Sequence, residues 1–540
     1  MKDISSTGSF IDFTLENFIY VDKTEYIPKL VKLKRVFISR PRRFGKSLTL
    51  DTIATLFETG VEPYFKGTWI YDKWTEPTYP VLRLNFLNLD NFSIDDFKNK
   101  LNSYITEFAN KIGVKEYAEK KEPEDSIDSM LEKLREEKRQ IVILIDEYDY
   151  QLTSNINHDD LYKQFQQKIK RFYANIKDKL AIKFLGITGV TRLKDVEIFS
   201  IGSDINDITN ESAFSQLIGF TRDEIKKYYI DHLKLAASYE NKCRVEEVTD
   251  AQIESMLDMM AQNYDGYCFD EDYEKKVFNT WSVNKFFQTM VGKKKVQFGE
   301  YWYDNGGLPS ILVNYLKIHE LNIFEYLDKD KFLKVSSDDF KNPTALTTIN
   351  QNVLMCQTGY LTLRSDLNKT STVALGIPNG EIYKALNRLL ANNIFKGNTD
   401  ITDDYGRSLL EVGTVDDIIN LFNSALNSVS YDNYPIVSES SVQNMLKLYL
   451  LGAHQKVLSE VHEAKGRADL VVNTDNRRIV FEFKYAKNET EAKSKLLDAV
   501  EQIKTRDYGN IVPKKTELLR IATVFNADPK VRAFTEFQLV

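Results

Sequence analysis

The sequence predicts an α/β protein with a parallel sheet at the front, a helical and mixed middle, and a second, smaller α/β region at the end. Short apolar runs alternate with helical patterns over residues 1–220, which favours a parallel sheet covered by helices. Helical and mixed patterns follow up to residue 435, and residues 436–540 return to a strand-rich pattern.

Four apolar runs are the candidate strands of the front sheet. They are Arg35–Ser39, Val81–Phe86, Ile141–Ile145 and Ile182–Ile187. Helical stretches, including Asp95–Ile112 and Ser126–Glu137, separate them. Strands and helices that alternate in this way are typical of βαβ units, whose strands run parallel.

The most informative stretch is Arg40-Pro-Arg-Arg-Phe-Gly-Lys-Ser47, which follows the first candidate strand and precedes a helical pattern. At such a helix start, backbone N–H groups can hold a phosphate, Lys46 can neutralise its charge and the Ser47 hydroxyl can bind Mg²⁺. The usual pattern has glycine where this chain has Arg40, so Gly45 alone must supply the unusual backbone angles. The residues expected to contact a nucleotide here are Arg43, Phe44, Gly45, Lys46, Ser47 and Leu48.

A second motif lies about 100 residues downstream, where the run Ile141–Ile145 ends in Asp146-Glu147. Carboxylates at the C-terminal end of a buried strand lie at the edge where α/β sheets bind ligands. We expect Asp146 to hold Mg²⁺ and Glu147 to polarise the water that attacks the γ-phosphate. Alone, the run is equally well a core strand followed by a solvated acidic turn. In this order and spacing, the two motifs together predict ATP binding and hydrolysis.

The fourth run leads into Gly186-Ile-Thr-Gly-Val-Thr-Arg192. A polar side chain on the strand beside the acidic one can sense a γ-phosphate, so Thr188 and Thr191 are candidates, and Arg192 would add positive charge. A strand end with turn residues explains each of them equally well. Arg192 or Arg222 is also a candidate for reaching the nucleotide of a neighbouring copy, which would require a homo-oligomer.

Composition places the chain among soluble globular proteins of about three or four domains. Its 540 residues are 42% hydrophobic and 28% charged, and the net charge of −7 gives no global basic signature, so any nucleic-acid contact must come from local patches. Three scattered cysteines form neither a metal motif nor a disulfide framework, which fits a reducing compartment. No apolar run reaches the ~18 residues of a membrane span, and the N-terminus lacks a signal peptide. We therefore expect a cytoplasmic protein with no membrane partner.

The pattern predicts four domains. They are a nucleotide-binding domain at 1–220, a helical lid at 221–330, a mixed or helical connecting domain at 331–435 and a last α/β domain at 436–540. Thr221-Arg-Asp-Glu224 marks the first boundary as a helix start, with a threonine cap and an acid three positions on.

The last domain holds a second chemical motif. Gly466-Arg-Ala-Asp469 opens an apolar strand, and Glu482 follows Asp469 by 13 positions. Residues i and i+2 of a strand share a face, so Glu482 and Lys484 point the same way, and a turn through Thr474–Arg478 brings Asp469 beside Glu482. This set predicts a Mg²⁺ or Mn²⁺ site with a water nucleophile, which Lys484 orients or deprotonates. Glu-x-Lys alone is more often an ion pair on an edge strand.

Three further residues belong to the prediction for this site. The helix Asn488–Lys504 would cover the sheet and bring Gln502 near the carboxylates. Glu460 and Glu439 compete to supply another acid. Glu460 is preferred because the chain from it toward Gly466 places it closer to the hairpin.

Along nearly its whole length the chain resembles the AAA-ATPase-like proteins of Bacteroides-type bacteria that carry a C-terminal PD-(D/E)XK nuclease domain. The residues that carry the resemblance are Tyr20–Thr24, Arg40–Ser47, Leu144–Asp149, Gly186–Gly189, Tyr264–Tyr267, Gly466–Asp469, Phe481–Lys484 and Gln502. Arg40 in place of glycine is usual in that family. The resemblance implies nuclease roles for Asp469, Glu482 and Lys484, and an acidic strand that lies beside the first strand.

The full fold prediction is therefore α/β: a P-loop NTPase parallel sheet, a helical and winged-helix-like middle region, and a C-terminal restriction-endonuclease-like α/β domain. Two functions follow. In one, ATP binding or hydrolysis exposes the metal site of Asp469 and Glu482 or aligns it on DNA or RNA, in defence or mobile-element biology. In the other, the chain is a nucleotide-gated switch or scaffold whose rear fold only binds nucleic acid or protein. Because Asp469, Glu482 and Lys484 are all intact, the sequence favours the nuclease.

Overall fold

The computed structural model describes residues 1–176, 179–193, 204–304, 310–316, 319, 323–343, 345–369, 371–395, 404–453, 455–463, 466–508 and 516–540. The chain divides into two compact units, Met1–Leu321 with Phe332–Ile382 and Asn322–Lys331 with Tyr383–Val540. Among the helices of the described ranges, none is both long and apolar enough to cross a bilayer. The finer division into four domains stays a prediction.

A five-stranded parallel sheet forms the centre of the first unit. Its strands are β1 (Arg35–Ser39), β2 (Val81–Asn85), β3 (Ile141–Asp146), β4 (Ile182–Gly189) and β5 (Asn206–Asp207). Every residue of β1 and β3 is buried, as expected for apolar strands covered on both faces. The four candidate strands and their parallel pairing are therefore confirmed, and β5 is an additional short edge strand.

The order of these strands differs from the expectation. The sheet runs β2-β3-β4-β1-β5, so β4 lies between β1 and the acidic strand β3. Ile38 of β1 pairs with Thr188 of β4, and Ile145 of β3 pairs with Ile187. The expectation that the acidic strand lies beside the first strand is wrong. Similar apolar strands do not encode their own order, and the result is that Thr188 ends between the loop and the acidic residues.

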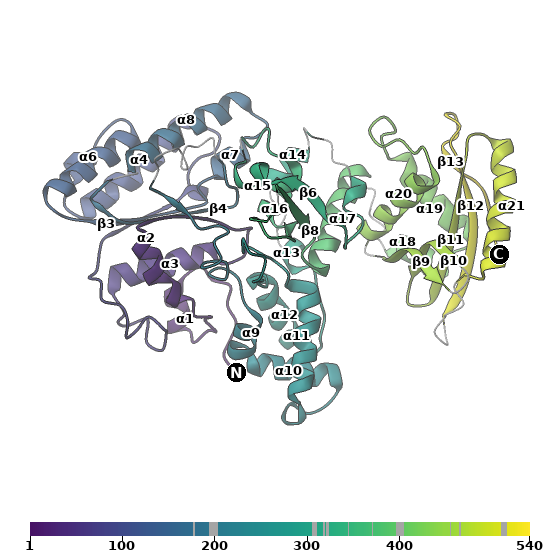
Figure 1. The fold of residues 1–540 in the computed structure, drawn as a ribbon, viewed down its shortest axis with the longest axis horizontal. Helices are drawn as coiled ribbons and strands as arrows, with labels where there is room; N and C mark the ends of the chain where they lie inside the picture. Colours follow the sequence, from purple (N-terminus) through teal and green to yellow (C-terminus); the bar gives the residue numbers. More distant parts are fainter. Residues whose placement is uncertain are drawn as a thin grey trace. The chain divides into compact units, whose positions relative to one another are not determined.

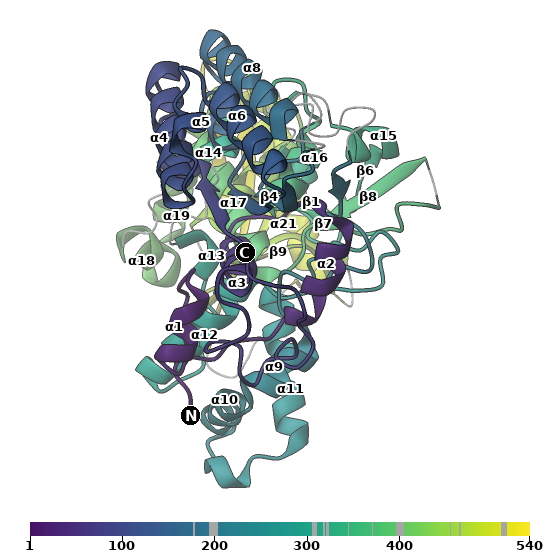
Figure 2. The ribbon, with the colours of Figure 1, turned by 90° about the vertical axis from the view of Figure 1, so that its left-hand side faces the viewer.

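Helices cover both faces of this sheet (Figure 1). On one face lie α4 (Ile94–Lys111), α6 (Pro123–Glu136) and α8 (Asp159–Ile176), which pack side by side (Figure 2). On the other lie α1 (Phe10–Leu15), α2 (Ile27–Leu33) and α3 (Lys46–Thr59). The predicted helix at Asp95–Ile112 corresponds to α4, whose N-terminus is capped by the Ser93 hydroxyl.

A helical bundle follows the sheet. It contains α9 (Arg222–Tyr228), α10 (Ile230–Asn241), α11 (Asp250–Tyr264) and α12 (Thr280–Lys293). Thr221 and Glu224 form the expected capping box at the start of α9. Buried apolar side chains such as Leu233, Met256 and Phe286 hold the helices together. The region after residue 220 is therefore helical as predicted, while its role as a separate lid domain stays a prediction.

The end of the first unit combines short helices with a three-stranded antiparallel sheet. Its elements are α13 (Tyr301–Asp304), α14 (Ser310–Leu316), β6 (Leu333–Ser336), α15 (Ser337–Lys341), α16 (Gln351–Thr358), β7 (Thr362–Leu363) and β8 (Thr372–Gly376), with sheet order β6-β8-β7. One strand, two helices and a strand pair in this order fit the winged-helix-like expectation. Most of α16 is buried within the unit.

The second unit is a mixed sheet between two helical layers (Figure 1). Its helices are α17 (Gly380–Ile394), which begins in the first unit, α18 (Asp404–Val412), α19 (Val415–Asn427), α20 (Glu439–Gly452) and α21 (Glu489–Arg506). Its strands are β9 (Lys456–Glu463), β10 (Gly466–Asn473), β11 (Arg477–Ala486), β12 (Glu517–Asn526) and β13 (Ala533–Leu539). The sheet order is β13-β12-β11-β10-β9, with β11 and β12 parallel and the other pairs antiparallel.

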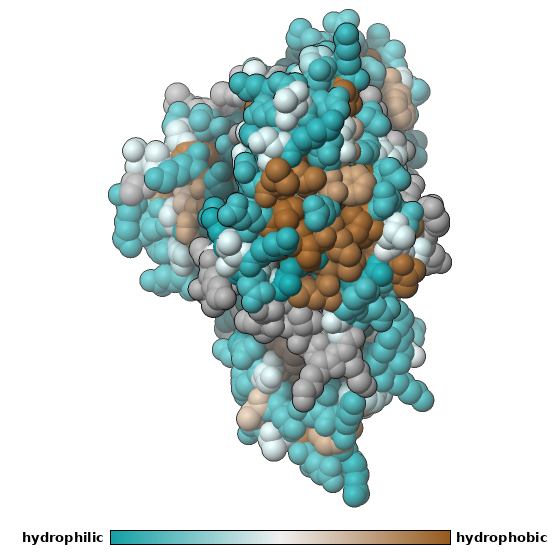
Figure 3. All heavy atoms as spheres, turned by 90° about the vertical axis from the view of Figure 1, so that its right-hand side faces the viewer, coloured by the Kyte–Doolittle hydropathy of each residue, from teal (hydrophilic) through white to brown (hydrophobic). Residues whose placement is uncertain are grey.

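α21 packs on β11, β12 and β13, while α19 and α20 lie on the opposite face. Ala499 and Ile503 of α21 bury against Val471 and Val480 of the sheet. Figure 3 shows that this unit also presents a patch of apolar side chains to solvent. The large apolar side chains of the second unit that are strongly exposed include Leu458, at 50%, and Leu497, at 68%.

Candidate functional site

The phosphate-binding loop takes its shape from two residues with a left-handed backbone. Gly45, the N-cap of α3, has a φ of 104°, and Arg43 has a φ of 67°. The expectation that Gly45 alone supplies the unusual angles is therefore wrong. A non-glycine residue in this region is strained. Arg43 is held there because its guanidinium lies 4.4 Å from the centre of the Trp281 ring and donates to the Trp302 carbonyl at 3.4 Å.

Arg40 occupies the first-glycine position as a buried support. Its side chain is 1% exposed, and its Nη1 donates to the carbonyl oxygens of Ser39 at 2.8 Å and Thr209 at 2.6 Å. Its guanidinium lies 4.1 Å from the centre of the Phe269 ring. Burial lowers the pKa of Arg40 to about 9. Arg40 thus ties β1 to the segment that follows β5, which fixes the start of the loop.

Phe44 anchors the other side of the loop. It is buried, and its ring packs edge-on against Tyr267 at 4.7 Å and Phe269 at 5.5 Å. The Tyr264–Tyr267 motif therefore supports the loop from the end of the lid. The Phe44 side chain serves this packing, so the predicted contact of Phe44 with a nucleotide could come only from its backbone.

The turn after α16 and the indole of α13 also press on the loop. A Cβ on Gly359 would lie 2.8 Å from the Pro41 Cβ, and Gly359 has a φ of +93°, so both space and backbone require glycine here. Trp302 donates its indole N–H to the Arg42 carbonyl at 3.3 Å. Segments more than 200 residues away in sequence therefore hold the loop in place.

Lys46 points back across the loop. Its Nζ donates to the carbonyl oxygens of Arg40 at 3.1 Å and Pro41 at 3.3 Å, and it lies 3.5 Å from Glu147 Oε1. The side chain is 4% exposed. An ammonium held between loop carbonyls and the acidic strand is placed where β- and γ-phosphates lie in such folds.

Asp146 joins the loop to β4. Its Oδ2 accepts a hydrogen bond from the Ser47 hydroxyl at 2.5 Å, and its Oδ1 accepts one from the Thr188 hydroxyl. The structure thus brings together Ser47, Asp146 and Thr188, which come from α3, β3 and β4. This is the juxtaposition predicted from the two motifs and the polar end of the fourth strand.

Glu147 stands next to Asp146 in a left-handed conformation, with a φ of 51°. Its carboxylate is 19% exposed and faces Lys46. Burial raises the pKa of Glu147, although the charge of Lys46 opposes the shift. A carboxylate with a raised pKa beside a phosphate-binding lysine suits a general base.

The other two candidates at the end of β4 have structural partners. The Thr191 N–H and hydroxyl both donate to Asp149 Oδ2, at 2.7 and 2.5 Å, and Thr191 is fully buried. Arg192 pairs with Asp207 of β5 and donates its N–H to Gln357 Oε1 at 3.3 Å. Of the three residues proposed to sense the γ-phosphate, Thr188 is therefore the one bonded to Asp146.

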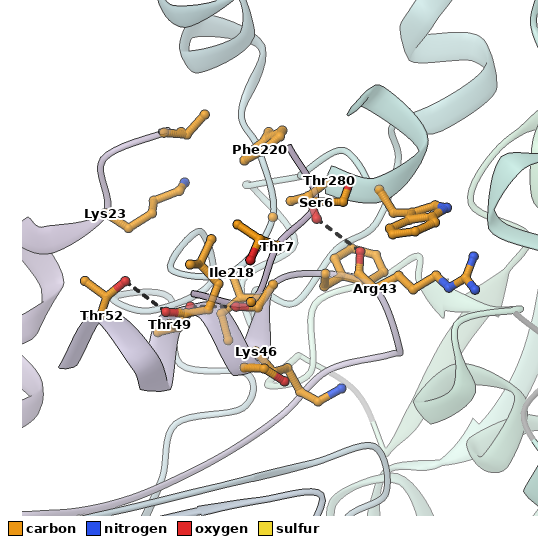
Figure 4. A pocket seen from close by; sticks show the side chains of 18 of the residues that line it. Ser6, Thr7, Lys23, Arg43, Lys46, Thr49, Thr52, Ile218, Phe220 and Thr280 are labelled. Carbon is orange, nitrogen blue, oxygen red and sulfur yellow. Dashed lines mark hydrogen bonds between the residues drawn. The ribbon is translucent and has the colours of Figure 1, made fainter. Parts of the chain in front are cut away.

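A cavity of about 650 Å³ opens beside the loop, within the range of ~300–1,000 Å³ common for ligand pockets. Every predicted nucleotide contact from Arg43 to Leu48 lines it. Other walls are the N-terminal segment Ser5–Gly8 and the segment Leu217–Phe220, which lies just before α9. Figure 4 shows Lys46, Thr7 and Ile218 around this cavity, from the loop, the N-terminal segment and the segment before α9.

The sequence argument missed the N-terminal segment as a wall of the cavity. The Ser5 carbonyl accepts a hydrogen bond from Asn284 of α12 at 3.1 Å, and the Phe10 N–H donates to Asp51 of α3 at 2.7 Å. The segment therefore bridges the lid and the helix that follows the loop. The segment contributes backbone carbonyl and N–H groups to these bonds. Because nearly every residue has such groups, its sequence shows no sign of this role.

Lys23 was also missed as a link to the lid. Its Nζ lies 2.6 Å from Glu224 Oε1 and donates to the Gln216 carbonyl at 2.7 Å. Burial lowers the pKa of Lys23, and the Glu224 carboxylate opposes the shift. The Tyr20–Thr24 motif was the available signal, but a lysine in a motif does not reveal its partner.

In the second unit, the hairpin places Asp469 and Glu482 on the same side of the sheet. Leu470 of β10 pairs with Phe481 of antiparallel β11, so Asp469 and Glu482 lie opposite each other with side chains on one face. Asp469 Oδ2 accepts a hydrogen bond from the Phe483 N–H at 2.9 Å. The predicted hairpin is confirmed.

Glu482 is fully buried and pairs with Lys484, whose Nζ lies 2.9 Å from Glu482 Oε1. The same Nζ lies 3.3 Å from Glu439 Oε1. Burial raises the pKa of Glu482 to about 7, with the Asp469 charge adding to the shift and Lys484 opposing it. Burial alone would lower the pKa of Lys484, but the surrounding carboxylates outweigh it and raise the value.

Glu439 is the acid that the described structure brings to this site. It is the first residue of α20, which Ser438 caps, and it is half-exposed at 44%. Glu460 lies in β9, and its side chain is outside the described part of the chain, so the preference for Glu460 is untested. Gln443, one turn into α20, donates to the Asp469 carbonyl, a contact that the sequence argument missed.

Gln502 lies on α21 as predicted, but its described hydrogen bond does not go to a carboxylate. Its Nε2 donates to the Tyr508 hydroxyl at 3.3 Å. Tyr508 is fully buried in the core beneath α21. Gln502 is therefore placed to position Tyr508.

Family models match both ends of the chain. Residues 5–199 match a predicted AAA-ATPase, and residues 437–534 match the PD-(D/E)XK nuclease superfamily. The chain joins an AAA-ATPase-like domain to a PD-(D/E)XK nuclease-superfamily domain. The resemblance seen in the motifs is confirmed, while the assignment to Bacteroides-type bacteria stays a prediction.

The chain is also similar to one protein along its length and, with low scores, to two solved structures. A protein described as "uncharacterized protein in vnfD 5′ region" from Azotobacter chroococcum mcd 1 is 25% identical over 528 residues, which cover 95% of this chain and 94% of that protein. The structure of a Walker-type ATPase of Pyrococcus abyssi matches with a TM-score of 0.37 and 12% identity, over 68% of this chain and 96% of that one. Cdc6p of Pyrobaculum aerophilum matches with a TM-score of 0.22 and 11% identity, over 68% and 93%.

The residues of the AAA-ATPase-like domain fit a magnesium ion that accompanies a nucleotide. Ser47 lines the cavity, and its hydroxyl is already 2.5 Å from the Asp146 carboxylate. Neighbouring hydroxyl and carboxylate oxygens are the ligands that Mg²⁺ prefers. These two residues would hold the ion beside the phosphates.

The nuclease-superfamily domain fits a divalent ion for a different reason. Glu482 Oε2 is buried and has no hydrogen-bond partner among the residues that the structure describes. An unsatisfied buried carboxylate oxygen is costly, and a cation held with Asp469 would satisfy it. Within the described ranges, no three His, Cys, Asp or Glu side chains gather closely enough to form a complete ligand set. Water or carbonyl oxygens would therefore complete the coordination.

Proposed function

We propose that this protein binds and hydrolyses ATP at one site and cleaves phosphodiester bonds of nucleic acid at another, with the nucleotide controlling cleavage. The ATP site, called the front site, contains Lys46, Ser47, Asp146 and Glu147. The cleavage site, called the rear site, contains Asp469, Glu482 and Lys484. The observation that carries the proposal is the buried Glu482–Lys484 pair, opposite Asp469, with one carboxylate oxygen that has no hydrogen-bond partner among the described residues. Most buried polar atoms of a folded protein have such a partner. A site that needs a cation explains the arrangement.

At the rear site, Asp469 and Glu482 would hold Mg²⁺, with Mn²⁺ as a substitute. When bound, the ion supplies an activated water and neutralises charge on the phosphate. Lys484 stands 2.9 Å from Glu482 and 3.3 Å from Glu439. Its raised pKa keeps it an ammonium, which can orient a water and neutralise charge that develops on the phosphate, while Glu439 keeps it in position.

At the front site, the chain's own residues support ATP hydrolysis. Ser47 and Asp146 would hold Mg²⁺, which draws charge from the β- and γ-phosphates when bound. Lys46 would leave the loop carbonyls to neutralise the same phosphates. Glu147 would take the proton of the attacking water, and its raised pKa supports this role. Thr188, whose hydroxyl donates to Asp146, would keep that carboxylate in position beside the γ-phosphate.

A continuous set of contacts supports control by nucleotide. Trp302 donates its indole N–H to the Arg42 carbonyl of the loop at 3.3 Å and its backbone N–H to Glu381 Oε1 at 2.8 Å. Ser282 of the lid donates to the other Glu381 oxygen at 2.7 Å. Glu381 is buried at the start of α17, the helix that continues into the second unit. A change in the loop or lid would therefore reach the base of that helix.

The test uses the full-length protein with plasmid DNA and with RNA, in Mg²⁺, Mn²⁺ or EDTA, each with and without ATP. Lys484→Ala is expected to lower cleavage by at least about 10²-fold and to leave ATP hydrolysis unchanged. Lys46→Ala is expected to abolish ATP hydrolysis and the ATP dependence of cleavage. Lys487→Ala, at an exposed lysine three residues from Lys484, is the matched control and should behave as the wild type.

The outcomes separate the parts of the proposal. Cleavage that is indifferent to ATP and to Lys46→Ala would contradict the control by nucleotide alone. Failure of the wild type to cut any nucleic acid would contradict the nuclease and favour a nucleotide-gated switch or scaffold. The choice between DNA and RNA comes from the same assay. ATPase rate measured against protein concentration tests the predicted homo-oligomer.

A further inference from the structure

Arg506 and Gly466 form an unusual contact beside the rear site. Arg506 is the last residue of α21 and is exposed, and its side chain crosses over Gly466 of β10. A Cβ added to Gly466 would lie 2.6 Å from Arg506 Cδ and 3.3 Å from the Tyr508 ring. Gly466 has no positive φ, so its backbone does not require glycine. A side chain at this position would instead displace the Arg506 stem, which fills the space three residues before Asp469.

The Arg506 guanidinium is held by a buried group. Its Nη1 donates to the Tyr508 hydroxyl at 2.8 Å, and the same hydroxyl accepts the Gln502 side-chain N–H at 3.3 Å. Tyr508 is fully buried, and its carbonyl accepts a hydrogen bond from Arg520 at 2.6 Å. A flexible, exposed arginine is thus fixed through one of its nitrogens by a rigid partner, and its other guanidinium nitrogen atoms make no hydrogen bond to the described residues.

Charge distinguishes Arg506 from the other cation of the site. The Lys484 ammonium is shared between the carboxylates of Glu482 and Glu439. Arg506 makes no ion pair with any carboxylate of the described residues, although the charges of Glu482 and Asp469 reach it and help to raise its pKa after the main effect of Tyr508. Arg506 is therefore a fixed cation within the field of the two metal-binding carboxylates.

We propose that Arg506 is the substrate-binding residue of the rear site and donates to the non-bridging oxygens of the phosphodiester presented to Asp469 and Glu482. The inference rests on the proposed nuclease function and names the group that holds its substrate. Three carboxylates near one lysine repel a phosphodiester. A planar guanidinium binds two phosphate oxygens at once, which both neutralises and orients the substrate.

Two measurements test this role in the full-length protein with a short DNA duplex. The first is cleavage under single-turnover conditions at saturating duplex, and the second is duplex affinity in Ca²⁺ as a function of salt. Arg506→Ala is expected to lower the cleavage rate by about 10²-fold. It should also reduce the slope of log affinity against log salt concentration by about 1, the value for one lost phosphate contact. Arg506→Lys should retain the salt slope and only part of the rate. Added guanidinium ion should partly restore Arg506→Ala.

Lys504→Ala is the matched control, because Lys504 is exposed on the same helix two residues earlier. It should keep the wild-type rate within about twofold. Gly466→Ala leaves Arg506 in the chain but displaces its stem, so cleavage should fall without loss of thermal stability beyond that of Arg506→Ala.

The inference and the nuclease proposal fail in different ways. If the wild type cleaves and Arg506→Ala cleaves equally well with an unchanged salt slope, Arg506 does not bind the substrate. If the wild type binds the duplex but cuts neither DNA nor RNA, the nuclease proposal fails and the salt slope still decides the role of Arg506. If the wild type neither binds nor cuts nucleic acid, both proposals are overturned.

Discussion

The two candidate sites of this protein handle charge in opposite ways. At the front, both oxygens of Asp146 accept hydroxyl hydrogen bonds, and Lys46 bonds to the carbonyls of its own loop. At the rear, one Glu482 oxygen pairs with Lys484, while the other is buried and has no hydrogen-bond partner in the described part of the chain. The charged groups of Asp146 and Lys46 in the front site have hydrogen-bond partners within the protein. In the rear site, by contrast, burial disfavours the ionised form of Glu482.

This difference has a thermodynamic consequence. A nucleotide that enters the front site has to exchange existing hydrogen bonds for new ones, so its binding energy is spent on rearranging Lys46 and Asp146. A divalent ion that enters the rear site relieves an unfavourable buried charge. The front site is thus suited to a conformational response, and the rear site to tight retention of an ion.

The largest expected effect tests whether the front site is catalytic or only a binding site. Glu147→Gln removes the proposed base but keeps its shape. ATP hydrolysis should fall by about 10²–10³-fold, while ATP affinity stays within a few-fold of the wild type. Measured turnover and equilibrium nucleotide binding give the two values. If Glu147→Gln hydrolysed ATP as fast as the wild type, the front site would be a binding pocket without this catalytic base, and the contrast between the two sites would not hold.

A second prediction asks whether the front site depends on its distant supports. Arg40→Gly restores the usual loop sequence but leaves the Ser39 and Thr209 carbonyls without their donor. We expect the free energy of unfolding of the first unit to fall by about 2–4 kcal/mol. Denaturant unfolding of the full chain should show this loss in one transition and leave the transition of the second unit in place.

Arg42→Gly is the control for that measurement, because the half-buried Arg42 side chain has no hydrogen bond or ion pair recorded among the described contacts. It should cost less than Arg40→Gly. Equal stability of the wild type and Arg40→Gly would mean that the loop holds its shape without this support.

The smallest expected effect sharpens the description of the rear site. Glu482 has a pKa of about 7 in the folded protein, raised from an ordinary value near 4.5 by burial. Its contribution to stability is therefore full below pH 4.5 and is lost as the pH rises through 7, because ionisation opposes folding. Glu482→Gln cannot ionise, so in EDTA it should be more stable than the wild type by about 1–3 kcal/mol at pH 8, with little difference at pH 4.5.

Thermal or denaturant unfolding from pH 4.5 to 8 gives this comparison, with the exposed Glu489→Gln as a control that should show no such gain. Mg²⁺ should raise the stability of the wild type at pH 8 and have little effect on Glu482→Gln. A pH profile for Glu482→Gln that parallels the wild type would show that the buried carboxylate is not the source of the difference.

Local patterns in the sequence predicted the elements of both sites, because strands and helices follow from short-range periodicity. The strands that end at Asp146 and Thr188 and the hairpin that pairs Asp469 with Glu482 were all foreseen in this way. Strand order was not, since β1, β3 and β4 have similar apolar sequences, and their order depends on packing that no short segment records.

The errors at the sites share a physical origin. The roles of Arg40 and Arg43 depend on rings and carbonyls that lie far away in sequence, so a glycine-based rule could not anticipate them. Glu439 reaches Lys484 from the start of another helix, a contact that spacing along the chain did not predict, while the preference for Glu460 stays untested. Spacing along the chain identifies partners within one hairpin but not those brought in by a separate element.

The aromatic and backbone supports of the phosphate-binding loop set the smallest piece of this protein worth producing on its own. Tyr267, Phe269, Trp302 and Gly359 all lie beyond residue 199, where the match to the AAA-ATPase model ends. A recombinant fragment cut at that point would leave Phe44 and Arg40 exposed where they are now packed. A fragment meant to report on nucleotide chemistry has to extend to residue 382, the end of the first unit.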